Sequence, residues 1–288
     1  MDVTLVPFGY RAKEGDFVDV SEVPRGRASG CICWFCRMPL VARQGDVKQW
    51  HFAHATRGNY RKVQDNCEFS FFVSVRMMAR QVVKESLALD LPAYRDSIDS
   101  CPMLPSRSRT VEFTVTEARS IVLSEVEVDT SFSGVPVDIV GTIEGFTFVV
   151  YFVHPGREVP SALKAGNLAD RKSGILAIDL GDVATLFAST RRERLPYAML
   201  LEDFLSHHIE SKHWVFHPRY ERVREQVNRQ ISGSLESELA KEASLGSVRQ
   251  GKFQCVMCGL SWASVNLGQP NCPKCQSHLY VSFKGYVE

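Results

Sequence analysis

The sequence has no excess of charge of either sign and no long apolar run. Its 34 Lys and Arg stand against 33 Asp and Glu, so the net charge neither requires nor excludes a nucleic-acid partner. No stretch approaches the roughly 18 apolar residues of a membrane-spanning helix, and the first residues lack the basic and apolar regions of a signal peptide. We therefore expect a cytoplasmic protein with no membrane partner.

Disulfides are not expected, although the chain has nine cysteines. Thiols stay reduced in the cytosol, and an odd number of cysteines cannot all pair. Six of them form three CxxC pairs, which are Cys33 and Cys36, Cys255 and Cys258, and Cys272 and Cys275. Cys31, Cys67 and Cys101 lie outside these pairs. The spacing indicates metal binding.

Two of the pairs lie in the segment 249–288, in the runs CVMC and CPKC, with thirteen residues between them. Each pair can occupy a tight turn in which two thiolates face one ion, and four thiolates complete a tetrahedral zinc site. A segment of this length is too short to build a sufficient apolar core. The metal would therefore supply folding free energy on the order of 10 kcal/mol. We predict a zinc ribbon with the ligands Cys255, Cys258, Cys272 and Cys275.

The N-terminal CxxC pair is followed, after fourteen residues, by the run HFAH. Two Cys and two His at these spacings match a structural zinc site, and four protein ligands leave no open position for catalysis. Alternatively, the histidines are polar surface residues beside an unrelated CxxC pair, and Cys31 could compete as a ligand. We predict a second zinc ion with the ligands Cys33, Cys36, His51 and His54.

The hydrophobic pattern divides the chain into four parts and predicts an α/β (α+β) protein. Short apolar runs between Gly and Pro predict a β-rich zinc module over residues 1–62. An α/β domain is expected over residues 63–190, a helical segment over 191–248 and the zinc ribbon over 249–288.

Within the α/β domain, helical spacing predicts one helix from Glu68 to Leu89, and runs rich in Val and Thr predict consecutive strands over residues 110–154. A short helix between Ser161 and Asp170, followed by a buried strand that ends at Gly181, predicts a strand–helix–strand unit. Residues 195–245 are predicted to be helical.

The stretch from Gly30 to His54, with its CxxC pair, its basic Arg-Gln-Gly turn and its HFAH run, resembles the N-terminal zinc module of the bacterial CoiA-type competence protein family. The resemblance implies a zinc module fused to a nuclease domain of the PD-(D/E)xK, or restriction-endonuclease-like, kind, which is a mixed sheet flanked by helices. It is specific over residues 10–60, weaker over 65–185 and absent beyond.

The family follows its zinc module with a helix that carries a Glu, then a His four residues later and a Lys eight residues later. Glu68 matches the first of these positions, but Phe72 and Arg76 occupy the other two.

The family's sheet carries a glutamate, then an Arg-Pro-Asp-like element, then a strand with Glu-x-Lys. Glu127 and Asp138 resemble the first two landmarks, and His154 closes the next strand. The expected acid and lysine of that strand fall on Val149 and Tyr151.

In such nucleases, carboxylates hold Mg²⁺ against the scissile phosphate while a lysine helps to activate water. Valine can do neither. The resemblance therefore leaves a residual catalytic or Mg²⁺- or Mn²⁺-binding set of Glu68, Glu127 and Asp138, with His154 or Lys164 as substitutes for the lysine. It implies an inactive or repurposed nuclease domain.

The leading hypothesis is a zinc-containing, non-cleaving DNA-binding component of a bacterial DNA-processing or defence system. One alternative is an active Mg²⁺- or Mn²⁺-dependent endonuclease. The other is an interaction protein that binds no nucleic acid and docks a partner protein through its helical segment or zinc ribbon. Basic clusters could contact phosphates, although such runs also mark solvated faces. They are Arg57, Arg61 and Lys62, then Arg107 and Arg109, Arg171 and Lys172, and Arg191, Arg192 and Arg194.

Overall fold

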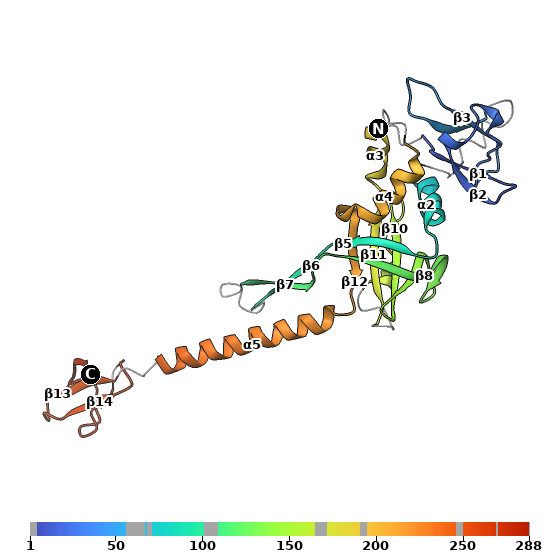
Figure 1. The fold of residues 1–288 in the computed structure, drawn as a ribbon. Coiled ribbons are helices and arrows are strands. Elements are labelled where there is room, and N and C mark those ends of the chain that lie inside the picture. Colours follow the sequence, from blue (N-terminus) through green and yellow to red (C-terminus); the bar gives the residue numbers. More distant parts are fainter. Residues whose placement is uncertain are drawn as a thin grey trace. The chain divides into compact units, whose positions relative to one another are not determined.

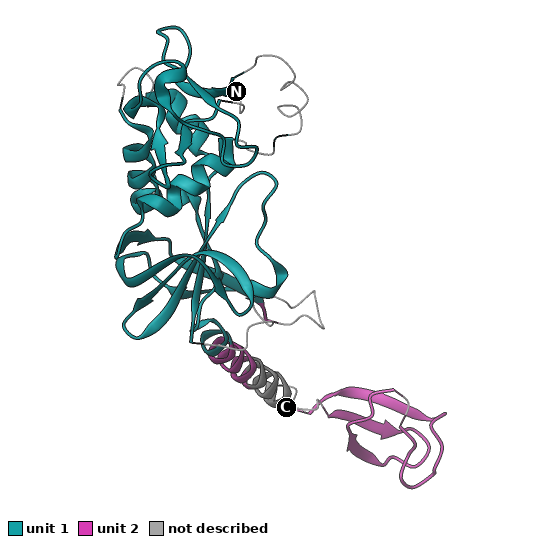
Figure 2. Cartoon of the chain, turned by 90° about the vertical axis from the view of Figure 1, so that its right-hand side faces the viewer, with its two compact units in different colours: residues 1–98, 110–224 teal, residues 99–109, 225–288 magenta. Residues whose placement is uncertain are grey.

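The structure is a computed structural model that describes residues 5–55, 67, 71–100, 109–164, 172–190, 195–245, 250–268 and 270–287. At 25% helix and 41% strand, the described part of the structure confirms the mixed α/β class. The chain divides into a sheet unit, residues 1–98 and 110–224, and a ribbon unit, residues 99–109 and 225–288 (Figure 2). None of the helices in the described ranges combines the length and apolar character that a bilayer crossing requires.

The sheet unit begins with two short hairpins (Figure 1). β1 (Phe8–Arg11) pairs antiparallel with β2 (Asp16–Asp19), and β3 (Leu40–Arg43) pairs antiparallel with β4 (His51–His54). Gly9 of β1 leaves no room for a side chain, because a Cβ atom there would lie 3.0 Å from the Cβ of Cys31 and from the ring of Phe52. This close packing makes the hairpins one end of the main apolar core.

Six strands form the central sheet, in the order β12-β11-β10-β9-β8-β5. They are β5 (Leu87–Leu91), β8 (Arg119–Phe132), β9 (Val135–Ile143), β10 (Phe146–Val153), β11 (Gly174–Asp179) and β12 (Lys212–Phe216). β10 and β11 are parallel, and the other neighbours are antiparallel. The parallel pair confirms the expected crossover. Of the predicted short helix, the structure describes a 3-10 turn at Ser161–Leu163, and residues 165–171 lie outside its described part.

Strand β10 is covered on both faces, which explains its unbroken apolar sequence. Val149 and Tyr151 pack with Phe216 in a small second core, whereas Val150 and Phe152 point to the other face and join the main core. The alternation follows from the two-residue period of a strand.

The predicted helix is shorter than the sequence pattern indicated. Helix α2 (Phe71–Val82) ends before the polar stretch at residues 84–86, and the predicted extension to Leu89 is wrong. Leu87, Leu89 and Leu91 are buried in alternation with more exposed neighbours, so this part is strand β5. Helix α2 contacts β1 and β2 of the hairpins, β8 of the sheet and helix α4 (Tyr197–His207). Helix α3 (Val183–Ser189) contacts α4.

The segment 195–245 is not helical throughout, because strand β12 separates helix α4 from helix α5 (Tyr220–Leu245). Strand β12 pairs antiparallel with β11 and closes one edge of the sheet. Pro218 lies between β12 and α5, where its fixed φ suits the approach to a helix. The sequence pattern did not predict β12, because this segment becomes a strand through its pairing with β11.

The remaining strands form two small sheets. β6 (Tyr94–Asp99) pairs with β7 (Thr110–Thr116), and the ribbon unit contains β13 (Gly251–Cys255), β14 (Ser261–Ser264) and β15 (Val281–Tyr286) in the order β14-β13-β15. Among the described residues from 250 onward, the buried apolar side chains are Phe253, Cys255 and Cys272. This is too small a core to hold the unit together by itself.

Candidate metal centres and the Asp138 ion-pair cluster

All three CxxC pairs adopt the same backbone turn. In each turn the residue after the second Cys donates its N–H to the carbonyl of the first Cys: Arg37 to Cys33 (3.0 Å), Gly259 to Cys255 (2.8 Å) and Gln276 to Cys272 (2.8 Å). The N–H of each first Cys bonds back to the carbonyl five residues ahead, in Met38, Leu260 and Ser277. The three closing residues have positive φ, at 59°, 73° and 55°. Such a turn directs both thiols of a pair to one point.

In the ribbon unit two of these turns face each other. The Sγ atoms of Cys255 and Cys275 are 3.9 Å apart, and those of Cys258 and Cys272 are 3.6 Å apart. All four sulfur atoms lie within 4.8 Å of one another. Four sulfurs at about 2.3 Å from a tetrahedral zinc ion would be about 3.8 Å apart, so the spacing fits.

The N-terminal cluster consists of Cys33, Cys36, His54 and Cys67. The Sγ atom of Cys36 is 3.3 Å from Nε2 of His54, and the Sγ atoms of Cys33 and Cys67 are 3.5 Å apart. This cluster therefore draws its ligands from one CxxC turn, from strand β4 and from a distant cysteine, whereas the ribbon unit uses two CxxC turns. The set is again four ligands of the kind that zinc prefers.

His51, a predicted ligand, is placed outside this cluster. Residues three apart on a strand point to opposite faces, so His51 and His54 of β4 cannot face the same ion. Nδ1 of His51 instead lies 2.8 Å from the carbonyl oxygen of Gln49. Cys67, which lies outside the CxxC pairs, takes the position expected for His51.

Cys31, the possible competing ligand, also lies outside the cluster. Its buried thiol is 3.4 Å from the carbonyl oxygen of Ser29, and burial raises its pKa to about 11.

One ligand in each cluster has a pKa that favours the metal-binding state, whereas the pKa values of Cys33 and Cys275 are raised. Burial lowers the pKa of His54, so its imidazole is neutral and can bind a metal. Burial raises the pKa of Cys272, but hydrogen bonds from the backbone of Cys275 and Lys274 outweigh it and lower this pKa to about 7. Each cluster could hold a structural zinc ion, and four protein ligands would leave no site for a reacting water.

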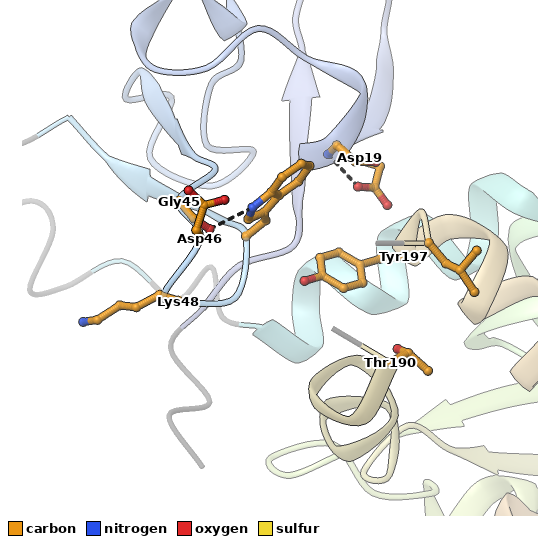
Figure 3. Close-up of a pocket in the computed structure, with 9 residues that line it drawn as sticks. Asp19, Gly45, Asp46, Lys48, Thr190 and Tyr197 are labelled. Carbon is orange, nitrogen blue, oxygen red and sulfur yellow. Dashed lines mark hydrogen bonds between the residues drawn. The ribbon is translucent and has the colours of Figure 1, made fainter. Parts of the chain in front are cut away.

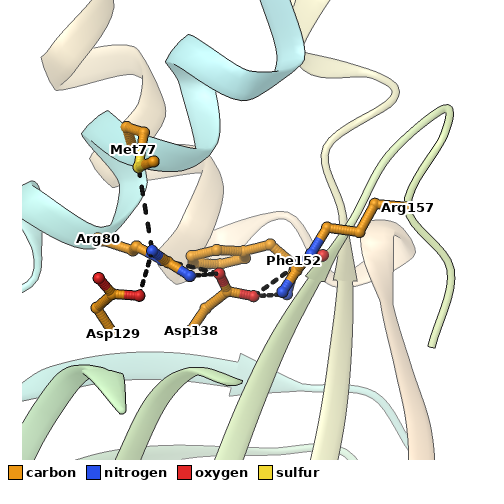
Figure 4. Close-up of polar contacts among 6 residues, drawn as sticks. All are labelled: Met77, Arg80, Asp129, Asp138, Phe152 and Arg157. Atoms are coloured by element: carbon orange, nitrogen blue, oxygen red, sulfur yellow. Dashed lines mark hydrogen bonds and ion pairs between the residues drawn. The ribbon is translucent and has the colours of Figure 1, made fainter. Parts of the chain in front are cut away.

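Asp138, the predicted catalytic acid, is fully buried on β9 and saturated by donors (Figure 4). Its Oδ1 accepts from Nε and Nη2 of Arg80, at 2.9 and 2.8 Å. Its Oδ2 accepts from Nη1 of Arg157 at 2.6 Å and from the N–H of Phe152 at 2.8 Å. Arg157 also lies over the ring of Tyr151, 3.8 Å from its centroid. No part of the carboxylate faces solvent.

Asp129 on β8, rather than Glu127, is the second acid of this cluster. Nη1 of Arg80 donates to Oδ1 of Asp129 at 2.6 Å, and Asp129 lies between residues that pair with Ile139 and Val137. Glu127 is exposed, and Glu68 lies outside the described residues. Among the residues that the structure describes, neither group able to share an ion contains Glu127 or Asp138. In the described part of the chain, Glu127 and Asp138 therefore do not form a shared ion site, and the role predicted for Glu68 stays a prediction.

The positions of the missing acid and lysine are buried in the second core, as Val149 and Tyr151. His154, a candidate substitute, stacks on Phe72 at 5.7 Å, and its Nε2 atom is buried. Burial lowers the pKa of His154. Lys164 is exposed and lines a cavity with His154 and Arg157. Arg76 also lies near Asp138. With Arg80 and Arg157, the arginines around Asp138 therefore outnumber the carboxylates of Asp138 and Asp129.

Of the basic residues predicted to contact phosphates, the structure describes Arg109 and Lys172. Both side chains are exposed. The other members of these clusters lie outside the described residues. The role of these clusters in contacting phosphates therefore stays a prediction.

A small cavity of about 60 Å³ separates the hairpins from helices α3 and α4 (Figure 3). Its buried acid, Asp19, accepts from the N–H of Ser21 at 2.8 Å and from the N–H of Ala198 in the first turn of α4 at 3.0 Å. A carboxylate at this position caps the helix and ties it to β2. Its role is structural.

Comparison with known proteins gives a match that overlaps the first of the two metal centres. Residues 16–59 match the family model described as competence protein CoiA, N-terminal domain. No match was found among curated proteins or among solved structures. The matched segment contains Cys33, Cys36 and His54, and the central sheet lies outside it. The match and the two Cys-rich clusters fit a metal-binding, competence-type protein, and over residues 16–59 the chain is similar to the N-terminal domain of CoiA.

Proposed function

We propose that the chain is a zinc-containing, DNA-binding component of a bacterial DNA-processing or defence system, and that its sheet derives from a nuclease fold that no longer cleaves. The observation that carries the loss of cleavage is the saturation of Asp138 by Arg80, Arg157 and the N–H of Phe152. A magnesium ion needs carboxylate oxygens that are free to enter an octahedral shell. Here both oxygens already accept from cationic or backbone donors.

The charge of the site supports the same proposal. A working metal nuclease gathers carboxylates around a cation, whereas this cluster places Arg80 and Arg157, both with little exposed side-chain surface, on a fully buried acid. Recruiting a divalent cation would require breaking buried ion pairs, which costs several kcal/mol. The acid has become a structural anchor between α2, β9 and the chain after β10.

Nicking of supercoiled plasmid in Mg²⁺ or Mn²⁺ tests the loss of cleavage. We expect no nicking by the wild type above a metal-free control. Asp138→Asn keeps the side-chain volume, and Asp129→Asn serves as the control because Asp129 is exposed yet shares Arg80. Robust nicking that Asp138→Asn abolishes in a folded protein, and Asp129→Asn does not, would establish a working endonuclease instead.

DNA binding is tested by gel retardation at several salt concentrations. The resemblance to a competence protein favours DNA, and contacts with phosphates would make the affinity fall steeply with salt. We expect salt-dependent retention by the zinc-loaded chain. An absence of retention at low salt would contradict this part of the proposal.

A protein partner is a second candidate, favoured by the apolar surface of the ribbon unit. Val256 and Met257 at the tip of one CxxC turn are 75% and 67% exposed, and Leu279 near the other is 74% exposed. Val256 donates its N–H to the carbonyl of Tyr280, next to Leu279, so these side chains are neighbours, and contiguous exposed apolar patches mark interaction sites. If Met257→Ser leaves DNA retention unchanged, the tip is free to bind a protein. Loss of retention would assign it to DNA.

A further inference from the structure

A second cavity in the sheet unit has the chemistry of an anion site. It has a volume of about 420 Å³ and lies where β10 and β11 begin, beside the first turn of α5. Asp138 bonds to Phe152, near the other end of β10. The cavity is therefore distinct from the Asp138 cluster, and no part of the proposed function so far uses it.

The cavity is strongly basic. Arg119, Arg219 and Arg222 line it together with Lys172, against the single carboxylate of Glu144. The three arginines are exposed, and no ion pair joins them to a carboxylate in the described part of the chain. They differ in this from Arg80 and Arg157, which both form ion pairs with Asp138. Guanidinium groups that are both clustered and unpaired are suited to binding phosphate.

The positive field of the cavity also acts on its buried histidine. Burial, together with the charges of Arg219 and Arg119, lowers the pKa of His217 to about 4. Nδ1 of His217 accepts from the N–H of Arg219 at 3.2 Å, which fixes the start of α5 at the cavity. The amide groups of this helix start add to the positive potential.

Aromatic rings supply the other half of a nucleotide site. Phe146 lines the cavity and is 45% exposed. Trp214 also lines it, and its indole is held in place by a hydrogen bond of 3.0 Å from Nε1 to the carbonyl of Pro92 and by the ring of Phe148 at 5.8 Å. Exposed aromatic faces next to basic groups are the means by which proteins bind unpaired bases.

We infer that this cavity binds a nucleotide unit, with its phosphate on Arg119, Arg219 and Arg222 and its base against Phe146 and Trp214. The volume is within the usual range for small-ligand sites. The inference rests on the proposed function in taking the nucleotide to be part of single-stranded DNA. A free nucleotide offers the same chemistry, and the two sources are separated by experiment.

The test compares variants that change the cavity with matched variants outside it. Arg222→Ala removes a lining arginine, and Arg224→Ala removes an arginine on the same helix that does not line the cavity. Phe146→Ala removes the exposed ring, and Val122→Ala removes a 62% exposed apolar side chain of the same sheet. All four side chains are exposed or largely so, and thermal melts check that each variant remains folded.

The probes are a fluorescein-labelled oligothymidylate and adenosine 5′-monophosphate. We expect Phe146→Ala to weaken oligothymidylate binding by roughly 5- to 100-fold, as for the loss of one stacked base. Arg222→Ala should reduce the slope of log affinity against log salt by about 1. Both control variants should match the wild type.

The outcomes separate this inference from the proposed function. If the wild type binds oligothymidylate and both cavity variants bind it equally well, the DNA-binding function stands and the cavity assignment is wrong. If the wild type binds no DNA, the proposed function fails. The cavity inference then survives only if adenosine 5′-monophosphate quenches tryptophan fluorescence in the wild type and Arg222→Ala abolishes the quenching. An absence of quenching would overturn it as well.

Discussion

The two Cys-rich centres are built from the same turn but stand in different surroundings. The N-terminal turn lies against a large apolar core, in which Phe8 and Phe52 are almost completely buried. The two turns of the ribbon unit have Phe253 as their main buried side chain among the described residues. A metal ion therefore adds to an existing core at the first centre and replaces a core at the second. Local ligand geometry alone does not show this difference.

Metal removal should produce the largest contrast between the centres. We expect a strong chelator to unfold residues 251–287, because zinc contributes on the order of 10 kcal/mol to such small units. The central sheet should stay folded, since its core does not depend on the ion. Hydrogen exchange followed by mass spectrometry measures both regions in one sample. Equal loss of protection in β10 and β13 would show that the two units fold together.

Asp138→Ala should have the opposite effect to metal removal, because it should destabilise the sheet unit and leave the ribbon unit unchanged. Removing the buried acid leaves Arg157 without its ion-pair partner and Arg80 with Asp129 alone, which costs about 3–5 kcal/mol. Urea denaturation gives the free energy of unfolding of the sheet unit, and zinc analysis shows whether the ribbon unit keeps its ion. Asp129→Ala is the control, and at 72% exposure it should cost less than about 1 kcal/mol. Equal costs for the two variants would contradict the buried-anchor role of Asp138.

Cys67→Ser should remove one zinc ion and leave most of the stability of the sheet unit in place. We expect two zinc ions per wild-type chain, one in Cys67→Ser and two in His51→Asn, because His54 and Cys67 complete the N-terminal set. Elemental analysis of the purified proteins gives the ratio. If His51→Asn loses the ion and Cys67→Ser retains it, the ligand set predicted from the sequence was right and the grouping in the structure is wrong.

Mild acid should weaken the sheet unit by a smaller amount through His217. Burial depresses its folded pKa to about 4 from an ordinary value of 6.5, so the unfolded chain binds more protons between these values. Stability should fall by about 3 kcal/mol as the pH falls from about 7 to about 4.

His217→Asn is the comparison for this pH effect, because Asn keeps an acceptor for the N–H of Arg219 but does not titrate. Denaturation curves for the two proteins at pH 7, 5.5 and 4 give the difference in slope. Parallel losses of stability would exclude His217 as the cause.

The sequence by itself determined the features that depend on local spacing. Cys255, Cys258, Cys272 and Cys275 could be grouped because each CxxC pair closes its own turn, whatever the rest of the chain does. The strands within residues 110–154 and β11 were predictable for a similar reason, because their apolar patterns reflect the faces they bury.

Only the tertiary structure decided the features that join distant segments. Cys67 lies beside Cys33 although 34 residues separate the two in the sequence, and β12 is a strand because it pairs with β11. The partners of Asp138 come from α2 and from the chain after β10, 58 and 19 residues away. Sequence motifs identify an acid but not the guanidinium groups that neutralise it, because side-chain contacts across a fold carry no fixed spacing along the chain.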